Sequence, residues 1–212
     1  MNKWLRPVLF FSLFLLPTAF LFLTATNAGL HQLVLHSNRI TGDFLTIVSA
    51  SGSLFGTLHL RDVRYADGID TVTIDTLHLT WTPSQLLNGL IHIHTIHGAN
   101  VQVLLGKSDT KTILSPFSLP GILQIDTVTA ETIAIFSEQK EVWKIRTGTI
   151  KDLSYQRQTL NVAELALTNE ATSVQAKGQL LTSNDYPLQL TMESHVHPDG
   201  FQPIAARGTV TG

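Results

Sequence analysis

The chain has 212 residues, a formal net charge of −2, nine histidines and no cysteine, with 14% charged residues and a mean hydropathy of +0.17. The near-neutral charge argues against a nucleic-acid-binding protein, and the lack of cysteine excludes disulfide scaffolds, cysteine-ligated metals and thiol catalysis. The 26 threonines favour strands, because β-branched side chains fit a pleated surface.

Residues 7–25 predict a single transmembrane helix. This run carries no charge, and a helix of ~19 residues reaches about 28 Å, close to the thickness of a bilayer's hydrocarbon core. Lys3 and Arg6 precede the run, so the positive-inside rule places the N-terminus in the cytoplasm and the bulk of the chain across the membrane. A cleavable signal peptide is the alternative, although the run is long for one and the cleavage site ending at Ala28 is poor. We expect residues 1–26 to form a cytoplasmic tip and an anchor.

The rest of the chain predicts a short helix followed by strands. In residues 27–42, Leu30, Leu33 and Val34 recur at helical spacing, which is typical of an amphipathic helix. From residue 43 to 212 apolar and polar residues alternate, as in a sheet with one apolar and one wet face. The expected fold is therefore mainly β, with an N-terminal transmembrane helix and an elongated, repetitive, curved antiparallel-type β-sheet over 43–212.

Local signals divide this β region. Asp67-Gly68 and Gly98 are typical of turns, and residues 82–89 favour one helical turn. Residues 106–121 contain Pro116 and Pro120 and predict a loop, which is the one candidate internal boundary.

Two internal repeats are present. Residues 60–65 (LRDVRY) reappear as residues 150–155 (IKDLSY), and residues 93–96 (IHTI) reappear as residues 125–128 (IDTV). After the first pair, apolar residues follow with the same internal spacing: Val72, Ile74, Leu77 and Leu79 against Leu160, Val162, Leu165 and Leu167. Repeats of this kind predict an array that grows by adding units, with about a dozen strands at ~4.8 Å each.

Residues suited to chemistry are scarce. His92 and His94 would share one face of a strand and, with His97, could hold a metal. The favoured interpretation is a solvated face, because the second repeat has Asp126 and Thr129 where the first has His94 and His97. No nucleophile elbow, phosphate loop or dinucleotide motif occurs. We therefore expect no enzymatic activity, no cofactor and no metal.

Several segments together resemble the start of TamB, a member of the AsmA-like proteins of diderm bacteria: residues 28–34 (AGLHQLV), 51–65 (SGSLFGTLHLRDVRY) and 76–81 (TLHLTW), the last leading into 86–89 (LLNG). The resemblance is closest over residues 20–105. It implies an inner-membrane, single-pass anchor and a long periplasmic β-groove (a β-taco) that serves phospholipid passage and outer-membrane biogenesis. It also implies a TamA-like outer-membrane partner, engaged by a C-terminal region beyond this chain.

The expected function is a bridge whose apolar groove covers phospholipid acyl chains between the inner and outer membranes. The candidate groove residues are Leu58, Leu60, Leu77, Leu79, Val101, Val103, Leu188 and Leu190. An assembly factor for outer-membrane β-barrel or autotransporter proteins, whose open strand edges pair with client strands, is the alternative. A secreted β-sandwich binding module is a third possibility, and it requires cleavage after Ala28.

Overall fold

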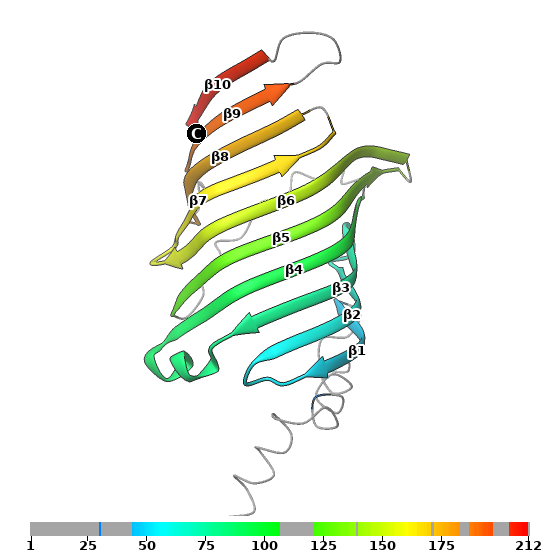
Figure 1. The fold of residues 1–212 in the computed structure, drawn as a ribbon, viewed down its shortest axis with the longest axis vertical. Helices are drawn as coiled ribbons and strands as arrows, with labels where there is room; N and C mark the ends of the chain where they lie inside the picture. Colours follow the sequence, from blue (N-terminus) through cyan, green and yellow to red (C-terminus); the bar gives the residue numbers. More distant parts are fainter. Residues whose placement is uncertain are drawn as a thin grey trace, which may run out of the picture.

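A computed structural model describes residues 30, 44–106, 121–138, 140–170, 172–182, 187–196 and 204–211. In these residues the chain is mainly β and forms one open, curved sheet, whose ten strands lie side by side in chain order (Figure 1). A short 3₁₀ helix, η1, stands between β3 and β4. The elements are β1 (Leu45–Gly52), β2 (Thr57–Ala66), β3 (Thr71–Trp81), η1 (Pro83–Asn88), β4 (Leu90–Leu105), β5 (Ile122–Ser137), β6 (Lys140–Gln156), β7 (Thr159–Thr168), β8 (Thr172–Leu181), β9 (Leu188–Val196) and β10 (Ile204–Thr211).

One strand pair departs from the antiparallel arrangement expected. β4 and β5 run parallel, with Leu90 opposite Ile122 and Leu105 opposite Ser137, whereas the other neighbouring strands of the described sheet are antiparallel. The chain between them, residues 106–121, is long enough for the return that a parallel pair needs. That segment therefore does not interrupt the sheet, which continues directly from β4 to β5.

The parallel register explains one of the sequence repeats. Ile93 lies opposite Ile125, Val101 opposite Ile133, and Val103 opposite Ile135, so the two copies lie side by side with equivalent residues in contact positions. Residues that face each other on β4 and β5 are therefore 32 positions apart in the sequence, which is also the spacing of the repeat. When repeats stack in register, equivalent residues lie side by side on neighbouring strands, as in a solenoid.

In the strands from β2 to β7, successive apolar residues are two positions apart and then, at one or two points, three positions apart. We call each point with a spacing of three a crease. In β3, for example, Val72 and Ile74 are followed by Leu77 and Leu79, with residues 75–76 between them. A first crease crosses the sheet at residues 61–62, 75–76, 99–100, 131–132 and 146–147, and a second crosses it at residues 94–95, 126–127, 151–152 and 163–164.

At four of the nine places where a crease crosses a strand, the crease contains a residue with a left-handed backbone conformation. Asp62, Asn100, Thr132 and Asp152 have φ between 49° and 54°, in the left-handed region that L-residues rarely adopt. Asp62 and Asp152 are equivalent residues of one sequence repeat, and Asn100 and Thr132 are equivalent residues of the other. One left-handed residue turns the strand so that the apolar side chains on both sides of it reach the same face. Figure 1 shows the long ribbons of β4, β5 and β6 bending along their length.

Other local predictions met different outcomes. The helical turn expected at residues 82–89 is confirmed as η1, which ends at Gly89 with φ 71°. Asp67-Gly68 forms the turn between β2 and β3, where the Asp67 carboxylate accepts hydrogen bonds from the backbone N–H of Ile69 and Asp70. The turn expected at Gly98 is wrong, because Gly98 lies buried within β4.

The predicted anchor at residues 1–26 lies outside the described residues, as does the amphipathic helix at 27–42 apart from Leu30, which is helical and 3% exposed. Across the residues that the structure does describe, no helix combines the length and the apolar character needed to span a bilayer.

Candidate functional site

Apolar side chains form continuous rows across the sheet, perpendicular to the strands. A row is a set of residues that face each other on successive strands. One row crosses most of the sheet: Leu58, Leu79, Ile96, Val128, Ile150, Leu165, Ala176 and Met192. A second, on the other side of the second crease, contains Ile93, Ile125, Leu153, Val162, Gly178, Leu190 and Val210. We call the surface formed by these rows the apolar face.

The first crease separates two further rows of the same face. One contains Leu60, Leu77, Gly98, Ala130, Gly148 and Leu167, and the other contains Ile47, Val63, Ile74, Val101, Ile133 and Ile145. The space above Gly98 is occupied by Ile74 and Val101 from across the crease, and the space above Gly148 by Ile133. Side chains from the two sides therefore converge over small residues, so the sheet bends toward its apolar face and forms a furrow there.

Six of the eight predicted groove residues lie in these four rows, and Val103 and Leu188 lie two residues along the same strands from Val101 and Leu190. Leu58 pairs with Leu79, Leu60 pairs with Leu77, and Val101 and Val103 lie opposite Ile74 and Val72. Leu188 and Leu190 lie opposite Leu180 and Gly178 in β8. Together with Leu160, Val162, Leu165 and Ala176 they line an apolar hollow of about 180 Å³ over β7–β9.

The apolar face is only partly covered. Val63, Ile125, Tyr155 and Ala176 are less than 9% exposed, but most of the row residues have intermediate exposure, and Trp143 is 67% exposed. A second layer that would turn this face into a closed core does not occur in the part of the chain that the structure describes. The described sheet thus presents apolar surface along its whole width.

On the opposite, polar face, five histidines of β2–β4 lie in two separate groups. His59, His78 and His97 lie opposite one another on β2, β3 and β4, with 2.8 Å between the Nδ1 atoms of His59 and His78. The ring centroids of His78 and His97 are 6.1 Å apart. His97 therefore belongs to this ladder and does not join His92 and His94, with which it was considered as a possible metal ligand.

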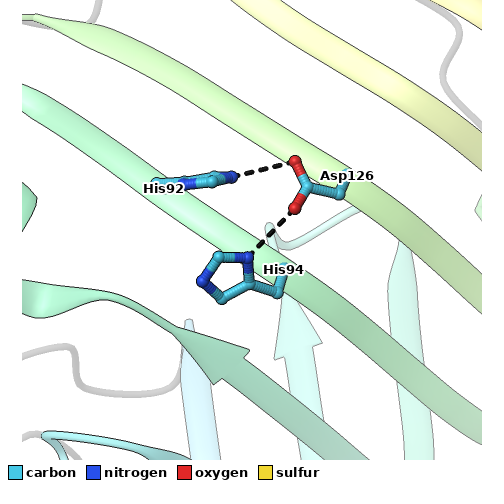
Figure 2. A group of neighbouring side chains, drawn as sticks. All are labelled: His92, His94 and Asp126. Carbon is cyan, nitrogen blue, oxygen red and sulfur yellow. Dashed lines mark hydrogen bonds and ion pairs between the residues drawn. The ribbon is translucent and has the colours of Figure 1, made fainter.

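The second group joins β4 to β5 at the second crease. His92 Nε2 lies 2.9 Å from Asp126 Oδ1, and His94 Nδ1 lies 3.0 Å from Asp126 Oδ2 (Figure 2). The Thr82 hydroxyl lies 2.7 Å from His94 Nε2. Hydrogen bonds from His92 and then His94 hold the pKa of the Asp126 carboxyl below its ordinary value, because they stabilise its charged form.

Sequence reasoning missed Asp126 as a partner of these histidines, although the signal was present. The repeat aligns His94 with Asp126, and this correspondence favoured a solvated face in the sequence analysis. In the parallel pair β4–β5, equivalent repeat positions are neighbours, so the same correspondence places imidazole beside carboxylate. The repeat therefore brings His94 and Asp126 together and gives no reason to regard the histidines as dispensable.

These features define a class of protein: an open, repetitive, creased β-sheet with one continuous apolar face. Residues 15–113 match the family model described as TamB, N-terminal domain. The resemblance found in the sequence is confirmed for this part of the chain, which is similar to the N-terminal domain of TamB-like proteins. Similarity to this family implies an association with the cell envelope. No curated protein matches the chain.

Proposed function

We propose that this protein is an inner-membrane-anchored, periplasmic bridge whose apolar face carries the acyl chains of phospholipids between the inner and outer membranes, in support of outer-membrane biogenesis. One observation carries the proposal: apolar rows run from strand to strand across the described sheet, on a bent face that no second layer covers among the residues that the structure describes. The rows run perpendicular to the strands, so the apolar surface continues in the direction in which the array grows.

The energetics favour such a surface. A phospholipid has about 30 methylene groups at ~0.8 kcal/mol each, so full exposure of its chains to water costs on the order of 25 kcal/mol. A furrow lined by Ile74, Val101 and Ile133 replaces this water on one side of the chain, while the open side leaves the head group hydrated. The nine strand spacings of the sheet at ~4.8 Å extend this cover over about 43 Å.

A conduit of this kind needs no catalytic group and no specific polar pocket, since the acyl chain is recognised by its apolar character alone. The expectation of a non-enzymatic role without a cofactor is part of the proposal. So is the topology, with residues 7–25 as the single membrane span and the sheet in the periplasm.

Photo-cross-linking in cells tests the proposal. A photoreactive amino acid at position 79 or 190, on the apolar face, is expected to capture phospholipid. The same probe at the neighbouring positions 80 and 191, which lie on the polar face, serves as the matched control and is expected to capture little. Equal lipid capture from both faces would refute the groove.

The second candidate function is assembly of outer-membrane β-barrel or autotransporter proteins together with a TamA-like partner. The sheet favours this candidate through its outer strand β10, which pairs on one side only within the described sheet. An edge strand with free backbone groups can accept a client strand. Probes along β10 that capture unfolded client protein, with no lipid captured at position 79 or 190, would favour assembly over lipid transport.

A further inference from the structure

We propose that His92, His94 and Asp126 form a binding site for a divalent first-row transition-metal ion, Zn²⁺ in the first instance, which ties β4 to β5. One potential ligand atom of each of the three side chains lies within 4.8 Å of those of the other two. The residues come from two strands whose backbones are held in register on both sides of the site, at Ile93–Ile125 and Thr95–Thr127. The site is separate from the apolar face and is independent of the lipid proposal.

The donor set suits this class of ion. Two imidazole nitrogens and one carboxylate oxygen are ligands that Zn²⁺ takes in open sites, with water in the fourth position. Metal–ligand bonds of ~2.0–2.1 Å in a tetrahedron place ligand atoms about 3.3 Å apart. His92 Nε2 lies 2.9 Å from Asp126 Oδ1 and His94 Nδ1 lies 3.0 Å from the other oxygen, Oδ2, so both nitrogens lie near this distance from the carboxylate, and the imidazole rings lie 4.3 Å apart between centroids. Figure 2 shows both rings directed toward the same carboxylate.

Thr82 completes the arrangement around His94. Without metal, His94 Nδ1–H donates to Asp126, and the Thr82 hydroxyl donates to His94 Nε2. When a metal occupies Nδ1, the proton moves to Nε2 and donates to the Thr82 oxygen, since a hydroxyl both donates and accepts. A metal-binding histidine generally has such a partner on its second nitrogen. The hydrogen bonds of His94 are therefore satisfied in both forms.

The three side chains are exposed enough for an ion to reach them, and the two strands hold their backbones in place. The side chain of His92 is 16% exposed, that of Asp126 is 38% exposed and that of His94 is 43% exposed. β4 and β5 are neighbouring strands of the parallel pair, so an ion held by both strands adds a side-chain cross-link to their backbone pairing. In the described part of the chain no other group of three His, Asp or Glu side chains has this spacing.

The test is a titration of the metal-stripped full chain, purified in detergent with an affinity tag that contains no histidine. Isothermal calorimetry with ZnCl₂ is expected to give one bound ion per chain, and Co²⁺ is expected to give the visible absorption of a site with nitrogen ligands. His92→Gln, His94→Gln and Asp126→Asn should each raise the Kd at least tenfold. His78→Gln, on the same polar face but in the other histidine group, should leave the Kd unchanged.

The wild-type titration decides the proposal even if a variant fails to fold, which circular dichroism would reveal. No saturable Zn²⁺ or Co²⁺ binding by the wild-type chain would overturn it. The proposal would equally be wrong if Asp126→Asn bound metal as the wild type does, or if His78→Gln abolished binding, because the ion would then lie in the other histidine group. Bound metal should also raise the unfolding temperature of the wild type, and not that of Asp126→Asn, as ion concentration increases.

Discussion

The strands β2–β7 and the strands β8–β10 build the same apolar face in two different ways. In β8 and β9 apolar positions alternate strictly with polar ones, as in Leu188, Leu190 and Met192. In β2–β7 the step of two is interrupted by a step of three, and left-handed residues such as Asp62 and Asp152 bend the strand there. The second crease ends at a bulge between β7 and β8, where residues 163–164 of β7 face Lys177 of β8 alone.

This difference shows what each arrangement supplies. Regular alternation provides two faces with little curvature beyond the normal twist of a sheet. A crease that crosses several strands at neighbouring positions adds a furrow, and because it runs across the strands it follows the apolar rows. The creased part therefore bends more than the regular part, at the cost of unfavourable backbone conformations.

The largest expected effect compares a charge on the apolar face in both parts with a charge on the polar face. Leu79→Asp in the creased part and Leu190→Asp in the regular part should each slow lipid passage at least tenfold, because a passing acyl chain then meets a desolvation barrier of a few kcal/mol. Thr80→Asp and Thr191→Asp are the neighbouring controls and should have mild effects. Transfer of labelled phospholipid from inner to outer membrane measures the rates.

Protease resistance and circular dichroism establish that each variant is folded, since the apolar face also stabilises the sheet. Normal transfer by a folded Leu79→Asp protein would reject the conduit and favour the assembly factor. A defect from Leu79→Asp alone, without one from Leu190→Asp, would restrict the lipid path to the furrow.

The next effect concerns the floor of the furrow. A Cβ atom at Gly148 would lie 3.1 Å from Ile133 Cδ1 and 3.3 Å from Leu167 Cδ2, whereas one at Gly208 in β10 would meet nothing within 4 Å. Gly148→Val should therefore destabilise the protein by about 1–3 kcal/mol through overpacking. Gly208→Val should be neutral or slightly stabilising, because valine favours strands. Urea unfolding measures both, and equal effects would show that the furrow is not closely packed at Gly148.

The sequence predicted the regular part of the sheet better than the creased part. The alternation of Leu188 and Leu190 with polar residues leads directly to an apolar face, and the structure places both residues on it. The spacing of Val72, Ile74, Leu77 and Leu79 predicts a repeated unit, but its step of three does not by itself indicate a bend in the strand. No residue type marks the bend, since Asp, Asn and Thr occupy the left-handed positions as well as ordinary ones.

The parallel pair and the histidine site were missed for a related reason. The direction of β5 depends on the end of the sheet to which residues 106–121 return the chain. The composition of that segment predicts a loop but does not predict its path. Once β4 and β5 are known to be parallel, the repeat alone places His94 beside Asp126. His97 could not be separated from His92 without the pairing of β3 with β4, which brings it next to His78.

A smaller effect tests the strain in a crease. Asp152 has φ 49°, so Asp152→Gly removes an unfavourable left-handed conformation and should stabilise the protein by up to about 1 kcal/mol. The same change at Gln175, an exposed residue of the regular strand β8, should destabilise by about 0.5–1 kcal/mol because glycine weakens a strand. The midpoints of urea unfolding give the sign of each effect. Destabilisation by both substitutions would mean that the crease stores no strain at Asp152.

The smallest effect lies at the turn between β2 and β3. Backbone N–H groups of Asp70 and Ile69 donate to the Asp67 carboxylate and hold its pKa below the ordinary value. Because the pKa in the folded state is lower than the pKa of about 3.9 in the unfolded state, the contribution is complete above about pH 4. This contribution is lost as the pH falls through the lowered pKa.

Amide protection of Ile69 and Asp70, corrected for intrinsic exchange, should therefore fall in acid. Asn169 N–H, which donates to the Thr172 carbonyl at the turn between β7 and β8, has no carboxylate partner there and should keep its protection. Parallel loss at both turns would indicate that acid opens the whole sheet and not the β2–β3 turn alone.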